Sequence, residues 1–318
     1  MLIAGILLIL FTLELFYFKV AGHFNITDTP NNRSSHAVTT LRGGGIIFSI
    51  SVFIYFLVFG WRFPFFATGL LALTIVSFAD DIKHQRRRLR IAIQLLATIL
   101  LLIETNFSIS PYLTWVMAML MIVAMLNAYN FMDGINGMIA LYSFVILAGL
   151  FIINRELHAF DEMLLVCVTL SNLVFTFFNV RKTARCFAGD VGSISMAYSL
   201  MFFTVSCIVV SGNPIFLLFF TVYAADVVIT ILQRMYKRET ILDAHRQHLF
   251  QYLSNEKKMP QLLVSGIYMF IQLFITAGVI MVWKKDLPTQ FVYAVVVILF
   301  VFILYATTKY RILKRLKI

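Results

Sequence analysis

Residues 261–283 read QLLVSGIYMFIQLFITAGVIMVW and contain no charged side chain. About 20 predominantly apolar residues in helical form cross the hydrocarbon core of a bilayer, so this run predicts a transmembrane helix. Ten similar runs lie on either side of it, at about 1–22, 44–60, 65–79, 91–105, 112–126, 137–154, 163–178, 194–211, 214–233 and 290–308. The sequence therefore predicts one all-α domain over residues 1–318, a polytopic bundle of ten or eleven transmembrane helices without a soluble domain.

The distribution of positive charge predicts the orientation of this bundle. The net charge of +11 would also suit a nucleic-acid-binding protein. With eleven helices, however, nearly all of the 26 Lys and Arg residues fall on one set of alternate loops, and the exceptions are Arg62, Arg155, Lys284 and Lys285. Positively charged loops face the cytoplasm, and they also attract anionic membrane lipids. We therefore expect the N-terminus outside, the C-terminus in the cytoplasm, and no nucleic-acid partner.

Four short polar segments interrupt the apolar runs, and all fall on the predicted cytoplasmic side together with residues 23–43. They are Asp80-Asp81, NAYNFMDGING at 127–137, GDVGS at 189–193 and DAHRQHLFQ at 243–251. Carboxylates beside hydrocarbon are costly and mark functional positions by default. The pattern predicts one site at the cytoplasmic face. Glu14 and Asp226, inside predicted helices, are equally compatible with helix–helix hydrogen bonds and with substrate contact.

The aspartate pair ends a predicted helix, where the helix macrodipole disfavours carboxylates. Adjacent helical residues point in different directions, so either Asp80 or Asp81 can enter the site while the other caps or pairs. In the alternative interpretation both acids are solvated and balanced by the basic residues that follow. Two of these, Arg88 and Arg90, are candidate phosphate contacts.

The NAYNFMDGING segment brings amides and an acid to one helical face. Asn127 and Asn130 are three residues apart, with Asp133 beyond them, and this spacing places side chains on one side of a helix. Gly134 and Gly137 allow a tight turn and a close approach of a ligand to the backbone. A polar hairpin would explain the glycines and amides, but it would not require an acid in a loop without basic residues.

The GDVGS segment precedes a predicted helix. Backbone N–H groups at such a turn attract anions, and the Asp190 carboxylate can hold a hard divalent cation. The alternative is an ordinary helix start with Ser193 as the N-cap.

The largest predicted cytoplasmic loop contains His245, Arg246 and His248. The HEXXH zinc pattern is absent, and two histidines alone make a poor zinc site. Imidazole and guanidinium groups suit sugar hydroxyls and diphosphate oxygens, whereas the alternative is a solvated loop. The glycine run at 43–45 and its basic neighbours either contact phosphates or form a flexible connector.

In this order along the chain, NNRSSHAVTTLRGGG at 31–45, the pair at 80–81, NAYNFMDGING, GDVGS and HRQHLFQ resemble the motifs of the bacterial polyprenyl-phosphate N-acetylhexosamine-1-phosphate transferases (MraY/WecA type). The HRQHLFQ form looks more like the branch that starts O-antigen and capsule-type glycans than the peptidoglycan branch, which carries adjacent histidines there. The chain departs from the family pattern at Thr39, Thr40 and Leu41, where relatives usually have prolines, and at Asn136, where many have an acid.

The resemblance implies transfer of N-acetylhexosamine-1-phosphate from a UDP-N-acetylhexosamine to undecaprenyl phosphate, with release of UMP, at the bacterial cytoplasmic membrane. Such phosphoryl transfer mostly needs positioning and charge neutralisation. We expect Mg²⁺, or Mn²⁺ in its place, on Asp190, with Asp80 as a second ligand. The expected catalytic acids are Asp80, Asp81 and Asp133; the nucleotide contacts are Asn127 and Asn130; the sugar and diphosphate contacts are His245, Arg246 and His248, with Arg88 and Arg90 on phosphate. Asn136 receives no metal or acid–base role.

Two other functions fit parts of the pattern. The first is the phospho-N-acetylmuramoyl-pentapeptide transferase of peptidoglycan synthesis. The second is a membrane transporter, which would place polar residues near the bilayer midplane and show inverted repeats. A homodimer is compatible with the pattern, and the sequence does not select the amino sugar or the glycan.

Overall fold

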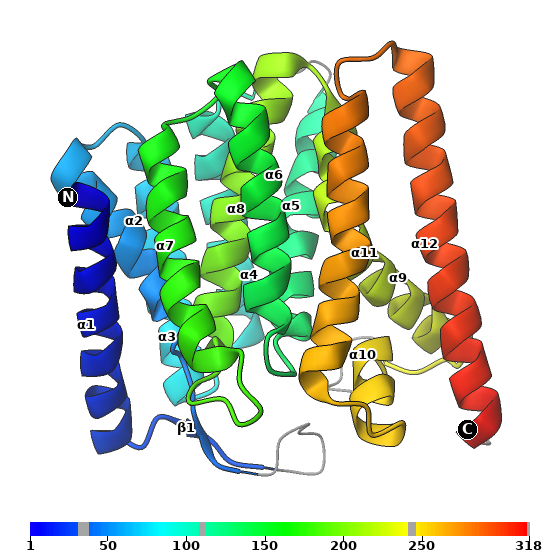
Figure 1. Ribbon diagram of the computed structural model, residues 1–318, viewed down its shortest axis with the longest axis horizontal. Helices are drawn as coiled ribbons and strands as arrows, with labels where there is room; N and C mark the ends of the chain where they lie inside the picture. Colours follow the sequence, from blue (N-terminus) through cyan, green and yellow to red (C-terminus); the bar gives the residue numbers. More distant parts are fainter. Residues whose placement is uncertain (31–37, 108–111, 241–245, 317–318) are drawn as a thin grey trace.

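Long helices run side by side and connect at the two ends of a bundle (Figure 1). The computed structural model describes residues 1–30, 38–107, 112–240 and 246–316. In chain order the helices are α1 (Leu2–His23), α2 (Ile46–Phe59), α3 (Pro64–Ile82), α4 (Arg87–Glu104), α5 (Tyr112–Met132), α6 (Met138–Leu157), α7 (Glu162–Asn179), α8 (Gly189–Ser211), the 3₁₀-helix η1 (Pro214–Phe220), α9 (Thr221–Tyr236), the short α10 (Leu249–Gln251), the π-helical turn η2 (Tyr252–Glu256), α11 (Gln261–Val282) and α12 (Leu287–Leu316). Two short strands, β1 (Thr27–Asp28) and β2 (Thr40–Leu41), pair antiparallel.

Nine helical segments within these described ranges are long and apolar enough to cross a membrane, and η1 and α9 together form one of them. Each of the eleven predicted runs overlaps a helix of the structure. The two that fall outside the nine are α2, which has only 14 residues, and α4, which carries arginines in its first turn. The all-α, multi-pass membrane class is therefore confirmed, while the number of crossings and the orientation stay predictions.

The helix α8 lies at the centre of the bundle because its small side chains let neighbouring helices approach closely. Of its most apolar 18-residue window 89% is buried, against 11% for α12. Ser195 on α8 hydrogen-bonds Ser49 on α2 at 2.8 Å. On another side, the aromatic ring of Tyr198 stacks on Phe66 of α3. The second and third turns of α8 are consequently held against α2 and α3.

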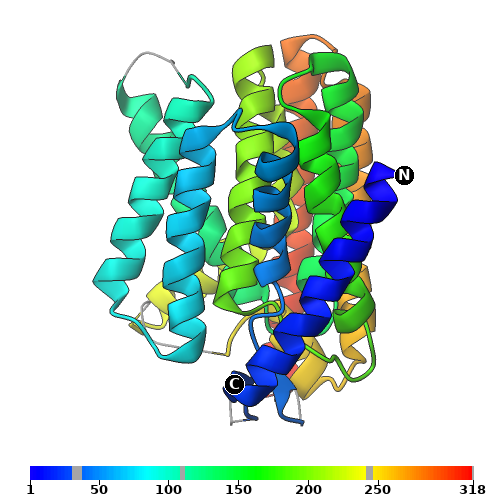
Figure 2. The same cartoon turned by 90° about the vertical axis from the view of Figure 1, so that its left-hand side faces the viewer.

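One end of the bundle collects the polar segments; it is the lower end in Figure 1 and is called the polar end below. It is formed by the last turns of α3, α5, α7 and α9, the first turns of α2, α4, α6, α8 and α11, the β1–β2 hairpin and α10. The four predicted polar segments meet there, as far as they lie within the described residues. Figure 2 shows α1 crossing the neighbouring helices obliquely and reaching the same end.

Candidate active site

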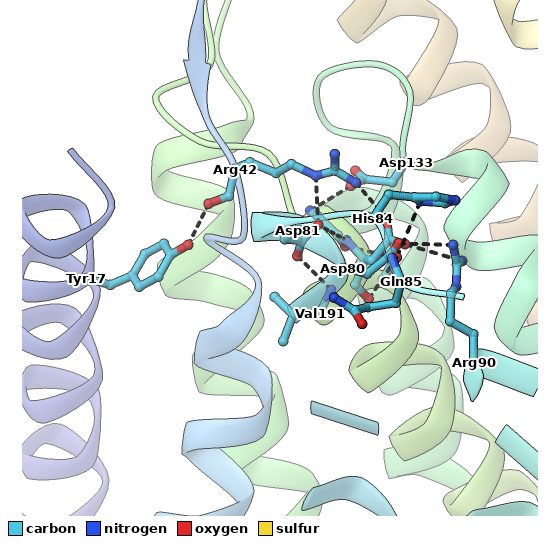
Figure 3. A network of polar contacts seen from close by, with 12 residues as sticks. Tyr17, Arg42, Asp80, Asp81, His84, Gln85, Arg90, Asp133 and Val191 are labelled. Carbon is cyan, nitrogen blue, oxygen red and sulfur yellow. Dashed lines mark hydrogen bonds and ion pairs between the residues drawn. The ribbon is translucent and has the colours of Figure 1, made fainter. Parts of the chain in front are cut away.

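Two arginines lie among the carboxylates of the polar end (Figure 3). Arg42 follows β2 and places Nε 2.7 Å from Asp81 Oδ1 and Nη2 2.8 Å from Asp190 Oδ1. Arg90, in the first turn of α4, places Nη1 3.0 Å from Asp80 Oδ2 and Nη2 3.3 Å from Asp190 Oδ2. The structure thus brings Asp80, Asp81 and Asp190 into one group, which together with Asp133 is called the acid cluster below.

Two of these acids hold the first turn of α8. The N–H of Gly189 donates to Asp133 Oδ2 at 2.9 Å, while the N–H groups of Asp190 and Val191 donate to the two oxygens of Asp81 at 2.9 and 3.0 Å. N–H groups at a helix start have no partner within the helix. The expectation that the GDVGS turn offers them to a substrate anion is therefore wrong for these three groups, because the chain's own carboxylates accept from them.

The Ser193 hydroxyl lies inside α8 and does not cap it. Its Oγ donates to the carbonyl of Gly189 at 2.9 Å, one turn back along the helix. The interpretation of Ser193 as an N-cap is therefore wrong, and the capping comes from the acids of α3 and the α5–α6 turn.

The glycine run at 43–45 packs against the backbone at the start of α8. The Gly45 N–H donates to the carbonyl of Ala188 at 3.1 Å. A Cβ at Gly45 would lie 2.4 Å from Gly192 Cα, so a side chain cannot be accommodated there without a shift. The described part of this segment is therefore a packed element and not a flexible connector, and its packing fixes the place of Arg42.

The two adjacent aspartates have different surroundings. The side chain of Asp81 is completely buried and accepts from Arg42 and from two backbone groups. Asp80 accepts from the N–H of Gln85 at 2.6 Å and shares Arg90 with Asp190. These contacts agree with the expectation that one member of the pair caps, which is Asp81. They leave Asp80 as the member that lies beside Asp190.

Burial raises the pKa of Asp133 to about 7, although the N–H of Gly189 and the charge of Arg42 act in the opposite direction. Like charges on Asp81 and Asp190 contribute to the increase. Near neutral pH this carboxyl is therefore close to its point of half protonation. The acid cluster can then carry fewer than four negative charges until a further cation arrives.

The two asparagines of the NAYNFMDGING segment separate in the structure. Asn130 lies beside Asp190, and its Nδ2 is buried. Asn127 donates instead to Gln94 at 2.9 Å and to the carbonyl of Val123 at 2.8 Å. Asn130 thus places its amide at the cluster, whereas the amide N–H₂ of Asn127 joins α5 to α4.

The two candidate arginines of α4 also differ. Arg90 reaches the acid cluster with a side chain that is 23% exposed. Arg88 is exposed, and within the described ranges the structure gives it no ion pair. Of the two, only Arg90 is placed to contact a phosphate at the cluster.

The loop residues that precede α10 pack against the turn that holds Asp133. His248 is 3% exposed, its ring lies 6.0 Å from that of Phe131, and a Cβ at Gly134 would lie 2.8 Å from the ring of Phe250. The solvated-loop interpretation is therefore wrong for His248. Arg246 lies 3.6 Å from Glu256, and His245 is outside the described residues.

Asn136 has a structural place. Its N–H and Nδ2 donate to the side chain of Gln261 and to the carbonyls of Arg181 and Lys182, and its carbonyl accepts from Ser265. These bonds tie the α5–α6 turn to α7 and α11.

Two residues stand out that sequence reasoning did not place in the site. Arg42 was considered only as part of a segment with basic residues, although it precedes the glycine run directly. Asp226, left open between two roles, lies 2.8 Å from His248. The other acid inside a helix, Glu14, is fully buried and has Oε1 3.7 Å from Cys186 Sγ.

These features define a class of protein, a multi-pass helical membrane protein with an arginine-bridged acid cluster at one end. The family model described as Glycosyl transferase family 4 matches residues 63–208, a range that includes all four acids of the cluster. This match and the transferases described next support a phosphoglycosyltransferase.

Similar proteins are found in several bacteria. The probable undecaprenyl-phosphate N-acetylglucosaminyl 1-phosphate transferase of Bacillus subtilis is 24% identical over 296 residues, which are 83% of this chain and 79% of the relative. The phospho-N-acetylmuramoyl-pentapeptide-transferase of Lactococcus lactis is 24% identical, over 70% of this chain and 74% of its own length. The protein of that name from Thermotoga neapolitana is 25% identical, over 78% and 87%.

Proposed function

We propose that the protein transfers N-acetylhexosamine-1-phosphate from a UDP-sugar to undecaprenyl phosphate and releases UMP. The observation that carries this proposal is the convergence of Arg42, Arg90 and Asn130 on the acid cluster at one end of a membrane bundle. Both reactants carry phosphates, and one of them has a lipid tail. A polar site at the end of a helical bundle is where a soluble donor and a membrane-bound acceptor can meet.

The residues suit a direct displacement at phosphorus. An oxygen of the acceptor phosphate attacks the sugar-linked phosphorus of the donor, and the bond from that phosphorus to the bridging oxygen breaks, so UMP leaves with the electron pair. Arg42 and Arg90 neutralise the charge of the diphosphate, since a guanidinium group matches phosphate oxygens with paired donors. Asp80 is placed beside Asp190 to orient the acceptor phosphate, while Asp81 and Asp133 keep α8 in position.

The acid cluster also fits Mg²⁺. Among the described residues no group of three His, Cys, Asp or Glu side chains is arranged to hold a metal ion alone. Mg²⁺ at phosphate-handling sites commonly takes one or two carboxylates and completes its shell with water and substrate phosphates. Asp190 and Asp80, which share Arg90, would supply those carboxylates, and four acids facing two arginines leave negative charge for a divalent cation. When bound, the ion would withdraw charge from the diphosphate bridge.

The donor end of the site is assigned to two segments. The amide of Asn130, which lies beside Asp190, can donate to the nucleotide or its phosphates. The loop with Arg246 and His248 packs on the turn that follows Asn130, so it is close enough to contact the sugar-diphosphate part. His245 belongs to the same proposed contact set by sequence alone.

The HRQHLFQ loop favours an N-acetylglucosamine-like or deoxy-amino sugar donor over the muramoyl-pentapeptide donor. It lacks the adjacent histidines of the peptidoglycan branch. Relatives named for both activities are 24% identical to this chain, so the pentapeptide transferase is the second candidate. With the favoured N-acetylglucosamine-like or deoxy-amino sugar donor, the lipid-linked product would start a cell-surface glycan of the O-antigen or capsule type.

The test is radiolabel transfer in detergent. Purified protein is incubated with undecaprenyl phosphate and, in separate reactions, UDP-N-acetylglucosamine, UDP-linked deoxy-amino sugars and UDP-N-acetylmuramoyl-pentapeptide, and the lipid product is identified by mass. We expect a lipid diphosphate sugar and stoichiometric UMP from an N-acetylhexosamine donor, and no product with Asp190→Asn. Transfer from the pentapeptide donor alone would select the second candidate, and UDP as the released nucleotide would refute the displacement at phosphorus.

A further inference from the structure

Asp226 is a buried acid outside the acid cluster. It lies on α9, is completely buried, and both of its oxygens have close partners. Oδ1 lies 2.8 Å from Nδ1 of His248, and Oδ2 accepts from the hydroxyl of Tyr268 on α11 at 2.8 Å. An acid so enclosed needs donors on each oxygen, and one of these donors belongs to the loop that we assign to the sugar-diphosphate end of the donor.

The other hydrogen bonds of the Asp226 carboxylate show which atom carries the hydrogen between Asp226 and His248. Oδ1 also accepts from the N–H of Leu249 and from the hydroxyl of Thr230, both at 3.3 Å. An ionised carboxylate only accepts hydrogen bonds, so Nδ1 of His248 carries the hydrogen. A partner on one ring nitrogen selects the tautomer and the orientation of an imidazole. The side chain of His248 also accepts from the N–H of Gln251, so only one of its two ring nitrogens carries a hydrogen. Asp226 therefore selects the tautomer and the orientation of the imidazole.

The ring of His248 is restrained on its faces as well. It stacks at 6.0 Å from Phe131, the residue that follows Asn130 on α5, and at 5.8 Å from Phe250. The imidazole is thus held between the NAYNFMDGING turn and its own loop. Rotation of the ring would break the Asp226 contact and both aromatic contacts at once.

Two side chains of the last helix complete this arrangement. The hydroxyl of Tyr305 accepts from the N–H of Leu249 at 2.9 Å, and Lys309 Nζ donates to Thr230 at 2.9 Å. Lys309 is only 2% exposed, although α12 is otherwise the least buried of the candidate spans. A buried lysine is rare unless it is paired, and this one reaches Asp226 through a single hydroxyl.

We propose that Asp226, supported by Tyr305 and Lys309 of α12, is a positioning residue that fixes the tautomer and orientation of His248 for contact with the sugar-diphosphate donor. The inference rests on the proposed function for the role of His248. The relation between Asp226 and His248 does not depend on it. The two can therefore be tested separately.

The first experiment needs no substrate. Protein labelled with ¹⁵N-histidine is measured by NMR in detergent, and the His248 resonances are assigned by their loss in His248→Gln. We expect a signature with hydrogen on Nδ1 in the wild type and a changed tautomer population in Asp226→Asn. A wild-type histidine protonated on Nε2 alone, or shifts that do not respond to Asp226→Asn, would overturn the proposal.

The second experiment is a double-mutant cycle on the transfer reaction. Asp226→Asn should lower kcat/KM for the UDP-sugar about ten- to a hundredfold, the usual cost of losing a residue that orients a functional histidine. In the His248→Gln background the same change should alter kcat/KM by less than about twofold, because its effect passes through His248. Equal losses in both backgrounds would show that Asp226 acts on the fold alone.

Two variants that each remove a single hydroxyl disturb the fold less than Asp226→Asn, and they separate the proposed role from misfolding. Tyr305→Phe and Tyr293→Phe each remove one hydroxyl of α12 that bonds to the backbone, of Leu249 and of Ile275 respectively. We expect Tyr305→Phe to lower kcat/KM severalfold and to shift the His248 resonances, with Tyr293→Phe unchanged in both. Identical behaviour of the two variants would contradict the proposed support by α12. If the wild-type protein transfers no sugar phosphate, the proposed function is refuted. The NMR result alone then decides whether Asp226 fixes the tautomer of His248.

Discussion

Asp81→Asn tests whether the second aspartate of the pair is a cap or a reacting group. The carboxylate accepts from Arg42 at 2.7 Å and from two N–H groups of α8 at 2.9 and 3.0 Å. An amide has one oxygen, so its NH₂ group would face either an N–H donor or the guanidinium. Hydrogen bonds to charged groups contribute about 1.5–3 kcal/mol each, and breaking a buried pair costs about 3–5 kcal/mol. We expect the free energy of unfolding to fall by about 3–5 kcal/mol.

Asp133→Asn is the matched control. Asp133 accepts one hydrogen bond from α8, from Gly189 at 2.9 Å, and an amide oxygen can accept it equally well. The expected loss of stability is therefore only about 1 kcal/mol. In addition, the amide removes the cost of ionising a buried carboxyl whose pKa is raised to about 7.

Both variants are measured by thermal unfolding in detergent, together with sugar-1-phosphate transfer at a temperature where each is folded. Asp81→Asn should lower the unfolding midpoint by several degrees, and its activity should fall along with the loss of α8 packing. A wild-type midpoint combined with a hundredfold loss of turnover would refute the capping role. Asp81 would then be a reacting group.

Four further predictions concern the metal, the glycine contact, the donor loop and the topology. Activity should vanish with a chelator and return with Mg²⁺ or Mn²⁺, and Asp190→Asn should lower turnover at least about a hundredfold; near-wild-type turnover at saturating Mg²⁺ would show that Asp190 is structural. Gly45→Ala should destabilise the protein, because its Cβ would lie 2.4 Å from a glycine of α8, and an unchanged unfolding midpoint would contradict the packing. Arg246→Ala should lower donor turnover about tenfold or more while UMP affinity, measured by calorimetry, stays constant, since each hydrogen bond to a charged group contributes about 1.5–3 kcal/mol; equal weakening of UMP would mean that the loop reads the nucleotide. A C-terminal reporter should be cytoplasmic and one within 284–289 external, and the reverse would reject the orientation.

The fold was largely predictable because a bilayer demands long apolar helices. The run at 261–283 contains α11 (Gln261–Val282) almost residue for residue, since nothing but length and apolarity decides such a segment. The predicted helix boundaries were less accurate where a helix begins with polar residues. The predicted run at 194–211 starts one turn after α8 itself, whose first residues are Gly189 and Asp190.

The sequence predicted which acids belong to the site. It did not predict which of them cap α8 and which lie beside Asp190. Asp80, Asp81, Asp133 and Asp190 were all found from their cost beside hydrocarbon. Arg42 reaches Asp190 across 148 residues of sequence, however, and no local pattern reports such a contact. The same limit applies to Asp226, whose role becomes visible only when the loop with His248 folds back onto α9.

The helix α2, which follows Arg42 and the glycine run, is short for a membrane crossing. Its 14 residues rise about 21 Å at 1.5 Å per residue, whereas the hydrocarbon layer is about 30 Å thick. In Figure 2 it stops short of the polar end of the neighbouring α3, and Arg42 lies just before its first turn. Hydrophobic mismatch of this kind is met by local thinning of the bilayer. Because Arg42 contacts Asp81 in the last turn of α3, a bilayer that thins around α2 would bring its headgroups to the acid cluster, where the phosphate of a polyprenyl lipid could arrive while its chain remains among the acyl tails.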